Sequence, residues 1–123
     1  MDLELSETVV DGGYAVVALR GELDLSTAEE LRDRLLAILA REAASLILDL
    51  SGLAFMDSTG VSLLVAIERR ANELGGTLKL VAPQKLVARV LHITSLDRHF
   101  LIFPTVDDAL LSGREAGPPV AAT

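Results

Sequence analysis

A serine follows an aspartate in the segment Asp57-Ser58-Thr59-Gly60, between a strand-like stretch and a helix-like stretch. One interpretation is structural: Ser58 caps the helix, because serine and aspartate are preferred at helix N-termini. A second interpretation adds electrostatics. A helix N-terminus has unpaired N–H groups and the positive end of the helix dipole, so it accommodates an anion. Ser58 is then a site for a phosphate, with Gly60 keeping the approach open, and the two interpretations are compatible.

Other kinds of chemistry have few residues to support them. The chain has no cysteine, which excludes disulfides, thiol catalysis and thiolate metal sites. His92 and His99 are the only histidines, and both belong to the third helical segment or the turn after it, so no Ser/His/Asp triad can be assembled. The glycine pairs Gly12-Gly13 and Gly75-Gly76 fit a turn and a helix end. We expect no enzymatic activity, no metal and no cofactor.

Composition and charge limit the location and the partners. Of the 123 residues, 50% are hydrophobic and only 3% are aromatic, which predicts a single domain with an aliphatic core. The net charge is −7 and the largest basic cluster is Arg69-Arg70, which argues against nucleic acid as a partner. The N-terminus is acidic, and Val61–Ile67 is too short to span a bilayer. We therefore expect a cytoplasmic protein without membrane insertion.

The pattern of apolar residues predicts an α/β domain. Glycines at 12 and 13 predict a hairpin between the first two strands, and helices between the later strands predict parallel pairing. We expect a mixed, mostly parallel sheet of four to five strands with about four helices, in a domain of residues 1–112 followed by a disordered tail at 113–123. The expected strands are Leu3–Val10, Tyr14–Arg20, Leu46–Leu50, Leu78–Val81 and Phe100–Phe103, and the expected helices are Ser26–Glu42, Thr59–Leu74, one after Pro83, and Val106–Leu111.

Helical spacing also predicts which side chains face the core. A capping box of Ser26 and Glu29 should begin the first helix. The expected core-facing residues of the three longer helices are Ala28, Leu31, Leu35, Ile38, Leu39; Leu63, Leu64, Ile67, Ala71, Leu74; and Leu86, Val90, Leu91. A stripe turned away from the core on the second helix comprises Ser58, Ser62, Val65 and Arg69. Val65 would be at least half exposed there; the equally weighted alternative is packing under the first helix or a loop.

Two segments carry a family resemblance. Asp49-Leu50-Ser51 followed by Phe55-Met56-Asp57-Ser58-Thr59-Gly60 resembles the signature of STAS-domain anti-sigma factor antagonists. The upstream Gly21-Glu22-Leu23-Asp24, followed by Thr27-Ala28, resembles the second hallmark of that family. The resemblance covers about residues 3 to 112. One departure is Ser95, where family members often have glycine before leucine.

The resemblance implies a partner-switching role. In that scheme an anti-sigma factor that is also a serine kinase phosphorylates the serine after the motif aspartate, here Ser58. The unphosphorylated protein binds the kinase and frees the sigma factor, the phosphorylated protein does not bind, and a serine phosphatase resets the switch. The protein itself is expected to be a monomer or weak dimer. The expected partner-binding residues are Asp24, Asp57, Ser58, Thr59, Gly60, Ser62, Val65 and Arg69.

Asp24 matches an acidic residue that the family places in the loop near the phosphorylation site. It also has a purely structural interpretation, because a carboxylate at a helix start interacts favourably with the helix dipole. Asp57 could likewise serve only as a turn residue.

Two alternative functions would use the same α/β pattern. A response-regulator receiver domain would use Asp57 as phosphoryl acceptor, but it requires an acidic pair after the first strand, where Asp11 stands alone, and a lysine later than Lys85. A closer alternative keeps the STAS fold and places the chain as a subunit of another assembly, such as a lipid-transport or stress-sensing complex. The intact Asp-Ser-Thr-Gly segment favours the phosphorylated switch.

Overall fold

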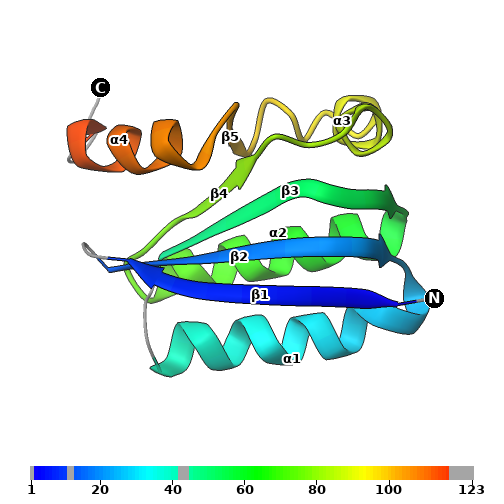
Figure 1. Ribbon diagram of the computed structural model, residues 1–123, viewed down its shortest axis with the longest axis horizontal. Helices are drawn as coiled ribbons and strands as arrows, with labels where there is room; N and C mark the ends of the chain where they lie inside the picture. Colours follow the sequence, from blue (N-terminus) through cyan, green and yellow to red (C-terminus); the bar gives the residue numbers. More distant parts are fainter. Residues whose placement is uncertain (1, 11–12, 42–44, 117–123) are drawn as a thin grey trace.

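The computed structural model describes residues 2–10, 13–41 and 45–116. Its five strands form one sheet in the order β1-β2-β3-β4-β5, in which β1 and β2 are antiparallel and the other neighbours are parallel (Figure 1). The predicted α/β architecture with a mixed, mostly parallel sheet is therefore confirmed. The elements are β1 (Leu3–Val10), β2 (Tyr14–Leu23), α1 (Leu25–Arg41), β3 (Ser45–Met56), α2 (Ser58–Glu73), β4 (Leu78–Val81), α3 (Lys85–Ile93), β5 (Leu101–Phe103) and α4 (Val106–Ala116).

Successive side chains of a strand point to opposite faces of the sheet, so the apolar core has two parts, one on each face. Leu46, Leu48 and Leu50 of β3 belong to the main core, with the apolar faces of α1, α2 and α3. Ile47 points the other way and forms a smaller cluster with Val81 and Ala109 of α4. In Figure 1, α1 and α4 lie on opposite sides of the sheet. Helices α1 and α2 thus share one face of the sheet, and α4 covers part of the other.

The strands β2 and β3 are longer than their apolar runs predicted. β2 continues to Leu23 and β3 to Met56, and these two residues pair across the ladder. The polar and small residues Ser51 and Gly52 suggested a strand end, but the pairing continues through irregularities in register. A Cβ at Gly52 would lie 2.8 Å from the backbone oxygen of Leu19, so close strand approach explains the glycine. As a result, β2 and β3 end side by side.

The helix faces agree with the predicted ones except near helix ends. All five predicted core residues of α1 are buried, but Leu74 and Leu86 are 40% and 47% exposed. Leu74 is the C-cap of α2 and so lies outside the helical repeat. α3 begins at Lys85, which places Val87 and Leu91 on its buried face. α4 continues to Ala116 past the predicted end at Leu111, while residues 11–12 of the predicted hairpin turn and 117–123 of the predicted tail lie outside the described residues.

Ser95 adopts a backbone conformation that favours glycine. The ends of α2 and α3 have the same hydrogen bonds: Gly76 N donates to Ala71 O, and Leu96 N donates to Leu91 O. The left-handed residue in this motif is Gly75 in α2, with φ +87°, and Ser95 in α3, with φ +62°. A side chain in this left-handed conformation is strained, so glycine would form the turn at lower cost.

Replacing Ser95 by glycine should therefore stabilise the protein. We expect Ser95→Gly to raise the free energy of unfolding by about 0.5–1 kcal/mol, because relief of left-handed strain exceeds the added entropy of the unfolded chain. Urea denaturation of the wild type, Ser95→Gly and Ser95→Ala measures this, and the alanine control should gain nothing. Equal stability of the glycine and alanine variants would contradict the strain argument.

Candidate functional site

Two helix N-termini meet at the edge where β2 and β3 end. β2 leads through Asp24 into α1, and β3 leads through Asp57 into α2. The turns are joined by a hydrogen bond from Asp57 N to Leu23 O of 3.4 Å. Because both helices follow parallel strands, their N–H groups and positive dipole ends lie at the same edge of the sheet. This edge brings Asp24 to the same side of the fold as Asp57 and Ser58, which come much later in the sequence.

Asp57, and not Ser58, is the N-cap of α2. The Asp57 carboxylate accepts hydrogen bonds from Thr59 N at 2.9 Å and from Gly60 N at 3.3 Å. The interpretation of Ser58 as the cap is therefore wrong: aspartate one residue earlier takes that place, and Ser58 becomes the first helical residue. Ser58 is exposed, and within the described part of the chain its hydroxyl makes no hydrogen bond. The hydroxyl is accessible to another protein.

Asp24 caps α1 in the same way. One oxygen of its carboxylate accepts from Ser26 N at 2.9 Å, Ser26 Oγ at 2.7 Å and Thr27 N at 3.2 Å. The predicted capping box of Ser26 and Glu29 is therefore wrong, because Asp24 competes successfully for the cap and α1 begins at Leu25. The structural interpretation of Asp24 as a carboxylate at a helix start is confirmed.

These hydrogen bonds make stability depend on pH. The hydrogen bond from the Ser26 side chain, followed by those from the Ser26 and Thr27 amides, lowers the pKa of Asp24 below its ordinary value of 3.8. A lowered folded-state pKa stabilises the fold above the unfolded-state value, and this contribution is lost as the pH falls through the folded-state pKa.

We therefore expect Asp24→Asn to be less stable than the wild type at pH 7. The difference should narrow as the pH falls below 3.8, since the asparagine variant lacks the titrating charge while keeping a capping oxygen. Thermal unfolding of both proteins between pH 7 and pH 2.5 measures the difference. A gap that stays constant over this range would show that the Asp24 charge contributes nothing.

Gly60 serves packing and does not keep the surface open. It is buried, and a Cβ at this position would lie 2.6 Å from Met56 Cγ and 2.9 Å from Leu23 Cγ. The predicted role of Gly60 in clearing the approach to a phosphate is therefore corrected. The glycine lets the first turn of α2 approach the ends of β2 and β3, and this contact positions Ser58.

The predicted stripe on α2 separates into two regions. Ser62 is exposed and borders a hollow between α1 and α2, whereas Val65 and Arg69 border a second hollow beside His99. Val65 is only partly exposed and packs against the main core, so the expectation that it is at least half exposed is wrong. The turn before β5 lies along this side of α2, where His99 Nε2 and the Glu68 carboxylate form a hydrogen bond.

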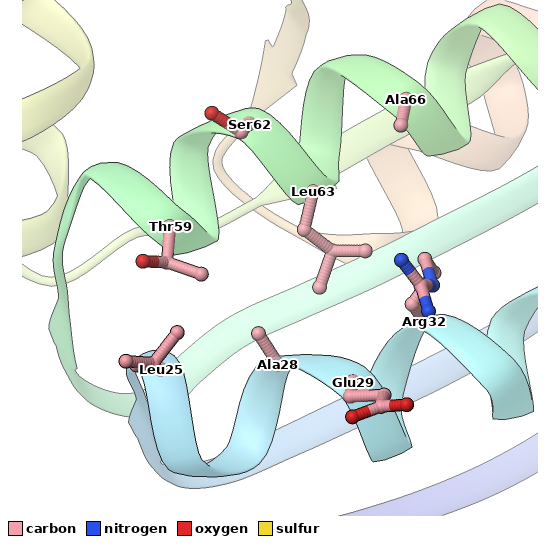
Figure 2. A pocket seen from close by; sticks show the side chains of 8 residues that line it. All are labelled: Leu25, Ala28, Glu29, Arg32, Thr59, Ser62, Leu63 and Ala66. Carbon is pink, nitrogen blue, oxygen red and sulfur yellow. The ribbon is translucent and has the colours of Figure 1, made fainter.

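A groove between α1 and α2 begins between Leu25 and Thr59, the residue that follows Ser58 (Figure 2). It has a volume of about 600 Å³ and is lined by Leu25, Ala28, Glu29, Arg32, Thr59, Ser62, Leu63 and Ala66. Sequence analysis identified Thr59 and Ser62 but missed Leu25, which is 79% exposed. An apolar residue directly after the cap of a helix was the signal that could have found it.

The described residues offer little for other chemistry. No group of three metal-ligating side chains occurs among residues 2–10, 13–41 and 45–116. His92 is exposed and bonds to Asp97 at 2.8 Å, which lowers the pKa of that carboxyl. Within the same ranges, none of the helices combines the length and the apolar character that crossing a bilayer requires.

Comparisons with known proteins show which family and which folds this chain resembles. The sequence model of the STAS domain matches residues 6–109. The chain is 34% identical to the anti-sigma-F factor antagonist RsfB of Mycobacterium tuberculosis, over 89% of this chain and 90% of that protein. Its structure is similar to an anti-sigma factor antagonist from Mycobacterium paratuberculosis, with a TM-score of 0.82 and 33% identity over 92% of this chain and 95% of that one. A putative anti-sigma factor antagonist from Thermotoga maritima has a TM-score of 0.84 and 27% identity, over 89% and 94% of the two chains.

Proposed function

This chain belongs to the STAS domain family, and we propose that it is an anti-sigma factor antagonist switched by phosphorylation of Ser58. The observation that supports this most directly is the division of roles at the start of α2. Asp57 bonds the free N–H groups of the first turn, which leaves the Ser58 hydroxyl exposed and unengaged. A capping serine would have to give up its hydrogen bond before reacting, whereas Ser58 does not.

The reaction is a phosphoryl transfer from a nucleoside triphosphate bound by the partner kinase. Ser58 Oγ attacks the γ-phosphorus, a new Oγ–P bond forms, and the bond to the diphosphate leaving group breaks. The serine proton passes to a base of the kinase, since the neighbouring carboxylate, Asp57, already accepts from Thr59 N and Gly60 N through Oδ1 and serves as the helix cap. A serine phosphatase would then hydrolyse the phosphate ester and restore the hydroxyl. The chain contributes the acceptor and no catalytic group.

A phosphate on Ser58 would change the surface more than the fold. It adds nearly two negative charges at pH 7 beside Asp57, on a chain with a net charge of −7. The helix N-terminus tolerates this anion, so α2 remains folded. A kinase surface that fits the neutral serine would instead meet excess negative charge and bulk. Release of the kinase frees it to bind its sigma factor, which is the partner switch proposed here, operating in the cytoplasm.

A pull-down identifies the partner. The Ser58→Ala protein, which cannot be phosphorylated, should retain from the native lysate an anti-sigma factor with serine kinase activity, and the wild type treated with that kinase and ATP should not. Recovery of subunits of a lipid-transport or stress-sensing complex in place of the kinase would show that this STAS domain is a subunit of that complex and not an anti-sigma factor antagonist.

A further inference from the structure

The mouth of the groove between α1 and α2 has an unusual residue. Leu25, the first residue of α1, is 79% exposed, more than any other large apolar side chain in the described ranges. It lies across from Thr59, one residue after Ser58 (Figure 2). An isolated exposed leucine is common on protein surfaces. Leu25 differs because it is continuous with a groove that has an apolar floor.

That floor comes from both helices. Ala28 of α1 and Leu63 of α2 are buried at its base, and Figure 2 shows Leu63 pointing from α2 toward α1. Ala66 continues the lining one turn farther along α2. The small side chains of Ala28 and Ala66 leave room for an inserted apolar side chain, with Leu25 as one wall. The groove therefore extends away from Ser58 along the two helices.

The charges around the groove indicate the chemistry of its occupant. Asp24 and Asp57 cap the two helices at its mouth, and Glu29 lines it, against the single cation Arg32 within the lining. A second copy of this chain would bring the same carboxylates and another charge of −7, which disfavours self-association here. The C-terminal helix α4 packs on the other face of the sheet. The charge pattern fits a different protein with a basic surface.

We propose that this groove is the docking surface for the anti-sigma factor kinase. An apolar side chain of the kinase inserts between Leu25 and Leu63, and a neighbouring lysine or arginine meets Glu29 and Asp24. The proposal rests on the proposed function and adds a recognition surface beyond the phosphorylated residue. It places the partner on the α1 side of α2, away from Val65 and Arg69.

Such a surface has a kinetic signature. Contacts outside the reacting group bind the ground state and the transition state equally, so losing them raises KM and leaves kcat unchanged. With the kinase recovered by the Ser58→Ala protein, we expect Leu25→Ser to raise KM for Ser58 phosphorylation about tenfold, as for loss of a moderate interface anchor. Glu29→Gln should raise it about threefold, and by less at high salt.

Matched controls separate this surface from general effects. Leu111→Ser removes another exposed leucine, 48% exposed, from α4 on the other side of the sheet. Glu30→Gln removes the neighbouring charge on α1, which lies outside the groove lining and beside β1. Both controls should retain the wild-type KM. Because Leu25, Glu29 and Glu30 are exposed, thermal unfolding should show the variants to be folded.

The outcomes distinguish the two proposals. Normal phosphorylation of the wild type with an unchanged KM for folded Leu25→Ser would overturn the docking surface and leave Ser58 as the switch. Failure of the kinase to phosphorylate the wild type would overturn the proposed function. A lower kcat at unchanged KM would make Leu25 a residue that orients Ser58 and not a docking contact. Loss of a dimer in sedimentation of Leu25→Ser would assign the groove to a second copy of this chain.

Discussion

Ser58→Ala should abolish phosphorylation by the partner kinase and leave binding of the unmodified protein intact. Ser58 is the exposed hydroxyl next to the Asp57 cap, whereas Thr59 is partly buried and Ser62 lies one helical turn farther along α2. Incubation with kinase and ATP should add one phosphate to the wild type and none to Ser58→Ala, as measured by intact mass. Thr59→Ala and Ser62→Ala are the matched controls, and both should accept the phosphate.

The phosphorylated protein should bind the kinase on the order of 100-fold more weakly, because enclosing a phosphate where the kinase surface fits a neutral hydroxyl costs several kcal/mol of desolvation. Ser58→Asp should weaken binding less, since one carboxylate has less charge and fewer acceptor oxygens than phosphate. Titration calorimetry with the unmodified, phosphorylated and Ser58→Asp proteins measures the series. Phosphate found on Thr59 or Ser62 by peptide mapping would refute the assignment.

Much of this site was predictable because it depends on short-range patterns. Apolar runs separated by helical segments predicted a mostly parallel sheet, and parallel strands that lead into helices place the helix N-termini at one edge. That rule agrees with the family resemblance, which placed Asp24 in the loop near Ser58. The segment Asp57-Ser58-Thr59-Gly60 then had one position in the fold, between β3 and α2.

The errors arose where two residues compete for one role or where packing in the folded chain decides burial. Ser58 and Asp57 are both good N-caps, and sequence preference alone does not choose between them. Val65 was expected to be at least half exposed from helical spacing, but it packs against the main core, and its side of α2 also borders the distant turn that contains His99. Leu25 was missed because it precedes the expected helix start at Ser26, whereas α1 begins at Leu25 itself.

The burial of Lys79 also could not be predicted from the sequence pattern, and we expect this residue to contribute strongly to stability. The run Leu78–Val81 predicted a strand, but it did not predict that the lysine within it is buried. Lys79 is only 3% exposed. Lys79 Nζ donates to Tyr14 OH at 3.1 Å and to Ala109 O at 2.9 Å, and it lies 4.9 Å from the centre of the Tyr14 ring. No carboxylate pairs with it in the described part of the chain. The lysine thus connects the sheet to α4 through dipoles and an aromatic ring.

We expect Lys79→Ala to lower the free energy of unfolding by about 2–4 kcal/mol. The change leaves a cavity under α4 and removes the donor that Ala109 O and Tyr14 OH share. Chemical denaturation measures the loss, with Lys85→Ala as the matched control. Lys85 is the other lysine of the chain and is exposed, so its replacement should change stability by less than about 0.5 kcal/mol.

Lys79→Met separates the aliphatic stem of Lys79 from its charge. Methionine has a similar volume and keeps the apolar contacts, while a buried ammonium without a carboxylate contributes little net stability after its desolvation. We therefore expect Lys79→Met to recover most of the stability that alanine loses, and to lie within about 1 kcal/mol of the wild type. If Lys79→Met is as unstable as Lys79→Ala, the hydrogen bonds to Tyr14 and Ala109 hold α4 on the sheet. If Lys79→Ala is as mild as Lys85→Ala, α4 docks through Ile47, Val81 and Ala109 alone, and the buried lysine is dispensable.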